Sequence, residues 1–113
     1  VQHAIFAMFE AFHQGKISIE KIIKKMAHNP AKIFKIEKRG FLKEGYYADM
    51  VLINPAKPWS VKKENILYKC GWSPFEGTNF KSRITHTFVN GQLVYHNSKV
   101  NEIKAGKRLL FNR

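Results

Sequence analysis

Residues 40–52 read GFLKEGYYADMVL, and this stretch decides the fold because the sequence period changes within it. Gly40 and Gly45 bracket a short segment, and glycine provides the backbone freedom that tight turns need. The run Met50–Ile53 is continuously apolar and ends at Asn54-Pro55, which is typical of a short buried strand. The residues before Gly40 follow helical spacing, so helices are expected first and strands afterwards.

The first expected helix covers residues 1–14. This segment contains no Lys or Arg, and Glu10 is its one acidic residue. Its apolar side chains recur at helical spacing and also fill positions in between, so the helix is apolar nearly all round. A helix of this kind must be covered on most sides.

Two further helices are expected between Gly15 and Gly40. The second begins after the N-cap Ser18 and carries one apolar stripe. Asn29-Pro30 is expected to close that helix and start a third, because Asn is a good N-cap and Pro suits the first helical turn. The third helix covers about residues 30–35 and turns Ile33 and Phe34 inward. The stripe of the second helix consists of Ile19, Ile22, Ile23 and Met26.

After the strand we expect a long loop, a hairpin and a tail. Residues 55–82 have little periodicity, and we expect at most one short element there, near residues 65–68. Asn90-Gly91 is the preferred pair for a type I′ turn, so residues 84–89 and 92–95 form a hairpin. Residues 98–113 are a basic tail that either docks or frays at its apolar end, residues 109–111. The expected core side of the hairpin is formed by Ile84, His86, Phe88, Leu93 and Tyr95.

Composition limits the class of protein. A chain of 113 residues with 44% hydrophobic and 13% aromatic residues suits one folded domain. It contains no uncharged apolar run near the ~18 residues that a membrane span needs. The single cysteine, Cys70, excludes an internal disulfide framework and an all-cysteine metal site. It fits a reducing compartment, and a cytoplasmic location is expected.

The charge is strongly basic, with 20 Lys and Arg against 8 Asp and Glu, or +12. Nine of these cations lie between Lys16 and Lys43, where they could form a face that attracts phosphate backbones. Lysine is also the common residue on solvent-facing helix sides, and no helix-turn-helix, RNP-like or zinc-finger pattern accompanies the charge. A nucleic-acid-binding module is therefore kept as an alternative only.

The sequence predicts no catalytic, cofactor-binding or metal-binding residue in this chain. Its histidines form no H-x-H or H-E-x-x-H motif, and Glu44 and Asp49 flank a turn, where a turn-stabilising role is expected. Cys70 has no evident histidine partner, and the glycines form no phosphate-binding motif. The histidines are His3, His13, His28, His86 and His96.

Residues 40–52 resemble the G-x-[IL]-x-x-G-x-x-A-D-[LM]-V-[LV] signature of the amidohydrolase superfamily. Asn29-Pro30-Ala31 is similar to the N-P-A segment that precedes this signature. Residues 72–77 (WSPFEG) and 87–95 (TFVNGQLVY) resemble motifs of dihydroorotases and their hydantoinase and allantoinase relatives. Residues 1–4 (VQHA) are similar to the start of the last large barrel helix in one group of dihydroorotases, which favours the dihydroorotase branch.

This resemblance implies a metal-dependent hydrolase of a cyclic amide. One or two zinc ions would activate a water molecule, and the reaction would interconvert dihydroorotate and carbamoyl aspartate in pyrimidine biosynthesis. The family's metal ligands all lie upstream of the position that corresponds to Val1, so no catalytic residue is transferred to this chain. The chain by itself is therefore expected to be inactive, and to need the missing N-terminal barrel of the same protein as its partner.

The resemblance also implies an α/β fold class with a definite organisation. Residues 1–39 would be the closing helices of a (β/α)8 TIM-type barrel. Residues 40–97 would be strands of a small composite β-sandwich with a long loop at 55–82, and residues 98–113 a basic tail. In isolation the first helix and one sandwich face would stay uncovered. The parent is expected to be a homo-oligomer without a membrane segment, and the second alternative is a catalytically inactive structural or partner homologue.

Overall fold

The computed structural model describes residues 1–112, which group into two compact units. Unit 1 combines Val1–Ile19 with Asn54–Arg83, and unit 2 combines Glu20–Ile53 with the chain from Ile84 onward. Each unit is therefore built from two segments that are distant in the sequence. Among the described residues, none of the helices has the length and apolar character required to cross a membrane.

Unit 1 contains one helix and three short elements from the excursion at residues 55–82. The helix is α1 (Ala4–His13), and a 3₁₀ turn, η2 (Lys63–Asn65), lies close to where one short element was expected. The strands β2 (Trp59–Ser60) and β3 (Asn79–Phe80) pair antiparallel. This ribbon was not predicted, because strands of two residues are too short to show a period.

The core of unit 1 lies between α1 and this ribbon. The Phe6 ring meets Trp59 edge-on with its centroid 4.8 Å away, and stacks on Phe80 at 5.6 Å. Phe9, Val61 and Phe80 are buried, and full burial of such a side chain contributes roughly 1.5–3 kcal/mol. Within α1 only Ala4 is exposed. The expectation that the isolated chain leaves this helix uncovered is therefore wrong in part, since the excursion covers one side of it.

The helical part of unit 2 does not break at Asn29-Pro30. Three segments follow one another directly: α2 (Ile19–Ile23), a π-turn η1 (Lys24–His28) and α3 (Asn29–Ile33). Asn29 is helical, with φ −64° and ψ −46°, and its N–H donates to the carbonyl of Lys24, five residues back. The Pro30 ring would clash with a carbonyl four residues back in a regular α-helix, and the wider turn relieves that clash. The expected N-cap role of Asn29 is therefore wrong.

Because the helical run continues, its buried positions differ from those expected. Ile22 and Ala31 are buried, with 2% and 6% of their surface exposed. Ile33 and Phe34 are 71% and 62% exposed, so their predicted inward orientation is wrong. Within the expected stripe of the second helix Ile23 and Met26 are also exposed. In an uninterrupted α-helix Ile33, eleven residues after Ile22, would return to the buried face of Ile22. The wider π-turn at Lys24–His28 shifts this phase, and Ile33 is exposed while Ala31 is buried.

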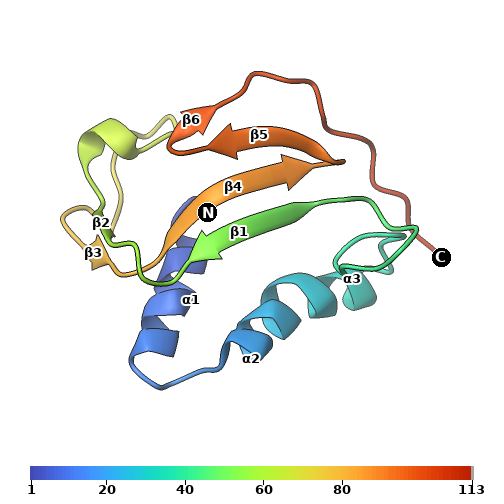
Figure 1. Cartoon of the computed structure of the whole chain (residues 1–113), viewed down its shortest axis with the longest axis horizontal. Coiled ribbons are helices and arrows are strands. Elements are labelled where there is room, and N and C mark those ends of the chain that lie inside the picture. Colours follow the sequence, from blue (N-terminus) through green and yellow to red (C-terminus); the bar gives the residue numbers. More distant parts are fainter. Residues whose placement is uncertain (113) are drawn as a thin grey trace. The chain divides into compact units, whose positions relative to one another are not determined.

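The strands of unit 2 form a four-stranded sheet in the order β1-β4-β5-β6, with neighbouring arrows running in opposite directions (Figure 1). Their bounds are β1 Met50–Asn54, β4 Arg83–Val89, β5 Gln92–His96 and β6 Lys99–Val100. The strand at Met50 is confirmed, but its predicted burial is not. Val51 and Leu52 are 45% and 50% exposed, and successive strand residues point to opposite faces. Both faces of this edge strand are therefore open.

The hairpin at Asn90-Gly91 is confirmed. Both turn residues have positive φ, 50° and 78°, as a type I′ turn requires. Asn90 tolerates this conformation because its short polar side chain is one of the few that visit the left-handed region.

The register of the hairpin differs from the expected one beyond the first two pairs. Phe88 lies opposite Leu93, but Thr87 lies opposite Tyr95, so Val94 is the extra residue of a β-bulge. Tyr95 consequently shares a face with Thr87 and not with His86, and its predicted grouping on one face with His86 and Phe88 is wrong. All residues of β4 are half-buried, so burial singles out neither face as the core side.

The apolar end of the tail docks. Glu37 N–H donates to the Leu110 carbonyl at 2.9 Å, and Asn112 N–H donates to the Lys35 carbonyl at 2.8 Å. Ile36 and Phe111 form an isolated antiparallel bridge. The last residue of the predicted tail, Arg113, lies outside the described residues.

Candidate functional site

The histidines occupy separate places in the two units. His3 and His13 each contact a serine in unit 1, at 2.9 Å and 2.8 Å. In unit 2 the His28 ring stacks on Phe41 with centroids 4.2 Å apart, and His86 stacks on His96 at the same distance. Residues 1–112 contain no group of three or more His, Cys, Asp or Glu side chains that could hold a metal ion. The zinc ion that the resemblance implies therefore does not fit the described residues.

Asp49 connects the turn at residues 40–49 with the hairpin. Its Oδ1 accepts a hydrogen bond from Asn90 N–H at 2.8 Å, and its Oδ2 forms an ion pair with Arg39. The Arg39 guanidinium lies 4.3 Å from the centroid of the Tyr47 ring, and Gly91 N–H donates to the Ala48 carbonyl at 2.9 Å. These contacts agree with the expected turn-stabilising role of Asp49, while Glu44 and Cys70 are exposed.

Gly40 explains why two of the sequence motifs occur together. Its φ is +81°, and a Cβ atom added to it would lie 2.5 Å from the Ala31 Cβ and 2.9 Å from the Ala27 carbonyl oxygen. Only glycine fits this contact between the turn and the helical run. Gly40 thus packs closely against Ala31 of the N-P-A segment, and both motifs have a structural role.

The first residues of the chain hold the loop at residues 65–77. The Gln2 amide donates to the Asn65 carbonyl at 2.8 Å and accepts from Leu67 N–H at 2.9 Å. His3 Nδ1 lies 2.9 Å from Ser73 Oγ, which also accepts from Phe75 N–H at 3.1 Å. Sequence reasoning missed this cluster, although both the opening VQHA and the WSPFEG segment belong to the same resemblance.

His3 is buried in a cage of aromatic rings. Only 3% of its surface is exposed, and the centroids of Trp59, Tyr68 and Phe75 each lie 6.1 Å from its ring. Burial lowers the pKa of His3. Its Nε2 is buried and has no hydrogen-bond partner among residues 1–112. The neutral imidazole is therefore the form that this cage stabilises.

This lowered pKa makes stability depend on pH. Below pH 6.5 the unfolded chain protonates His3 while the folded protein still keeps it neutral, so the free energy of unfolding decreases as the pH falls through that range. Above pH 6.5 His3 is neutral in the folded and in the unfolded chain, so it no longer makes the free energy of unfolding depend on pH. In the variant His3→Phe, urea unfolding between about pH 5 and pH 8 should show a smaller pH dependence. An unchanged slope in that variant would contradict this assignment.

A second histidine–serine pair lies at the other end of α1. His13 Nε2 is 2.8 Å from Ser82 Oγ, and the Ser82 carbonyl accepts from the Trp59 indole N–H at 2.9 Å. Glu10 adds a contact, since its Oε1 accepts from Lys81 N–H at 2.7 Å. The excursion is thus held at both ends of one helix.

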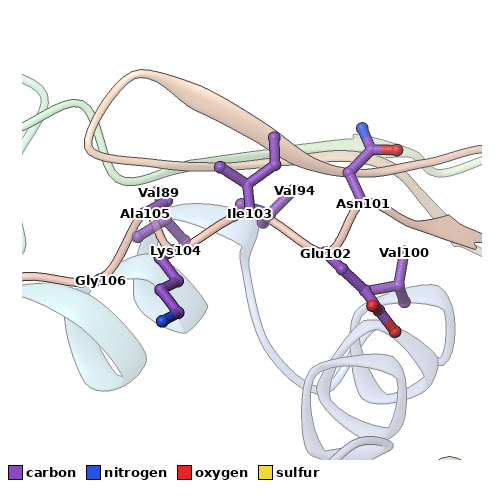
Figure 2. Close-up of a pocket in the computed structure, with 9 residues that line it drawn as sticks. All are labelled: Val89, Val94, Val100, Asn101, Glu102, Ile103, Lys104, Ala105 and Gly106. Atoms are coloured by element: carbon purple, nitrogen blue, oxygen red, sulfur yellow. The ribbon is translucent and has the colours of Figure 1, made fainter.

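Unit 2 carries a groove of about 670 Å³ (Figure 2). It is lined by Val89, Val94 and the extended segment at residues 100–106. Along that segment Asn101 and Ile103 point to one side, while Glu102 and Lys104 point to the opposite side (Figure 2). The lining is mainly apolar and brings no set of polar groups together, so it lacks the convergent polar side chains of an active site.

The model of the amidohydrolase family matches residues 1–94, and the chain belongs to this family. Among curated relatives, the dihydroorotase of Pyrococcus horikoshii is 34% identical over 103 residues, which are 91% of this chain and 24% of that protein. The dihydroorotase of Endomicrobium trichonymphae is 44% identical over 86 residues, 76% of this chain and 20% of that protein. These matches confirm the resemblance to dihydroorotases. The chain spans about a quarter or less of the length of these relatives.

Solved structures of hydantoinases share the fold. A D-hydantoinase superposes with a TM-score of 0.75 at 21% identity, over 81% of this chain and 20% of that one. The L-hydantoinase of Arthrobacter aurescens superposes with a TM-score of 0.73 at 26% identity, over 80% of this chain and 20% of that one.

Proposed function

We propose that this chain is the C-terminal portion of a dihydroorotase-like, zinc-dependent amidohydrolase that interconverts dihydroorotate and carbamoyl aspartate in pyrimidine biosynthesis. The observation that carries the proposal is the match to a dihydroorotase over 91% of this chain but only 24% of the relative. The longer polypeptide that contains this chain is called the parent below. Because residues 1–112 offer no metal-binding group, the catalytic centre and its zinc belong to the rest of the parent.

In this proposal residues 1–39 are closing helices of the parent's barrel and residues 40–97 are strands of its sandwich, followed by the basic tail. The antiparallel sheet and the likeness to hydantoinase structures support the assignment. The structural roles of Gly40 and Asp49 also support it, since both motif residues hold the turn and hairpin together. The parent is proposed to be a cytoplasmic homo-oligomer.

Exposed apolar side chains support a larger parent. Six hydrophobic residues of the described chain are buried, while fifteen large hydrophobic side chains are exposed. Soluble proteins commonly expose single hydrophobic side chains, but they rarely expose many of them when so few are buried. On the helical run of unit 2 the most exposed ones are Ile33 and Phe34.

The proposal is tested by comparing the 113-residue chain with the parent in a dihydroorotate hydrolysis assay. With zinc present, the chain alone should give no turnover, whereas the parent should hydrolyse dihydroorotate and lose this activity after metal chelation. Hydantoin and allantoin serve as alternative substrates. Turnover by the chain alone would show that the metal site does not lie in the rest of the parent, and would contradict the proposal. A folded, zinc-loaded parent that hydrolyses none of the three would favour the inactive homologue.

A further inference from the structure

The two histidine–serine pairs of unit 1 have the same chemistry but lie at opposite ends of α1. His3 and Ser73 meet at its N-terminal end, and His13 and Ser82 meet at its C-terminal end. At 1.5 Å per residue the two histidines are separated by about 15 Å along the helix. Both pairs attach the excursion to α1, so they provide a matched comparison.

We propose that His3 and Ser73 are positioning residues for the substrate entrance of the parent, and that the loop they hold forms part of its wall. This inference rests on the proposed function. In a (β/α)8 barrel the active site lies at the C-terminal ends of the strands, and each helix that follows a strand begins near that face. If α1 is a barrel helix, its first turn and the attached loop lie at the catalytic face, and the pair at His13 lies at the opposite face.

Stability alone does not account for a histidine at this position. The imidazole is buried among apolar rings, and its Nε2 has no partner among the described residues. A buried polar atom without a partner lowers the stability of the fold, whereas an apolar ring of similar size would not incur that penalty. What His3 adds over such a ring is the directional contact to Ser73, which fixes the loop against the helix.

The loop held in this way presents apolar side chains to the outside. Leu67 is 68% exposed and Trp72 is 60% exposed. Both lie close to the hydrogen bonds that hold the loop to the start of the chain. Leu67 N–H binds Gln2, and Trp72 precedes Ser73. A large side chain next to a fixed anchor has a defined position, which suits it to shape an entrance.

The test compares steady-state kinetics of dihydroorotate hydrolysis by variants of the parent. His3→Phe and Ser73→Ala should raise KM about tenfold or more with kcat within about twofold, because small misplacements of binding groups can cost up to ~100-fold. His13→Phe and Ser82→Ala should lower the melting temperature but leave KM and kcat within about twofold.

Trp72→Ala provides a variant that does not depend on the buried cage. Trp72 is 60% exposed in this chain. If it also stays exposed at the entrance of the parent, as the proposal requires, its replacement should leave the melting temperature unchanged and still raise KM. Leu42→Ala is the matched control, since Leu42 is 80% exposed and lies in unit 2. It should change neither KM nor kcat.

The outcomes separate the two proposals. A wild-type parent that hydrolyses no cyclic amide overturns the proposed function. An active wild type in which the pairs at both ends of α1 change the kinetics equally, or in which Trp72→Ala leaves KM unchanged, overturns the positioning role alone. If His3→Phe does not fold, Ser73→Ala and Trp72→Ala decide the question.

Discussion

Replacing Gly40 with alanine is expected to lower the free energy of unfolding by about 3 kcal/mol or more. The new Cβ would lie 2.5 Å from the Ala31 Cβ and 2.9 Å from the Ala27 carbonyl oxygen. Neither atom belongs to a flexible side-chain end, so the helical run or the turn has to shift. Alanine would also have to adopt φ +81°. Urea unfolding of the protein measures the loss.

Gly45 provides the control for this experiment. Its φ is also +81°, but no atom lies within 4 Å of a Cβ added there. Gly45→Ala should therefore reveal the backbone strain alone, about 1 kcal/mol. Equal losses in the two variants would show that the contact between Gly40 and the helical run is absent in solution.

The second large effect is expected for Asp49→Ala. This substitution leaves the Arg39 guanidinium, of which 10% is exposed, without its ion-pair partner, and it removes the acceptor of Asn90 N–H. Breaking a buried ion pair typically costs 3–5 kcal/mol. Because a third of the Asp49 side chain is exposed, about 3 kcal/mol is expected. Thermal or urea unfolding measures this loss.

A double variant tests the cause of that loss. Adding Arg39→Met to Asp49→Ala removes the unpaired buried charge and should restore part of the stability. Glu44→Ala, which removes an exposed acid of the same turn, should leave the unfolding midpoint unchanged. If the double variant is no more stable than Asp49→Ala, the ion pair is not the source of the effect.

Sequence reasoning succeeded where a local signal was strong. Asn90-Gly91 specifies its turn through the φ values that both residues adopt, 50° and 78°. The helix at residues 4–13 and the strand at residues 50–54 follow from long apolar patterns. The turn-stabilising role of Asp49 also follows from local chemistry, although its hydrogen bond reaches Asn90, 41 residues away.

The errors arose where the chain adopts an irregular backbone geometry that the sequence pattern does not specify. Asn29-Pro30 has the sequence of a helix start, but a π-turn at residues 24–28 accommodates the proline and the helix continues. The π-turn changes the helical phase, and Ile33 is exposed while Ala31 is buried. The β-bulge at Val94 places Tyr95 opposite Thr87. The residues around Val94 contain no sequence signal that predicts this bulge.

The family, the change from helices to strands near Gly40, the hairpin turn and the absence of a recognisable metal-ligand motif can be read from the sequence alone, because they depend on residue types and on spacings over a few residues. Only the tertiary structure joined His3 to Ser73 and His13 to Ser82, and Gly40 to Ala31. Such contacts form between segments as far as 70 residues apart. Their geometry depends on how helices and loops pack, and periodicity along one segment contains no information about its distant neighbour.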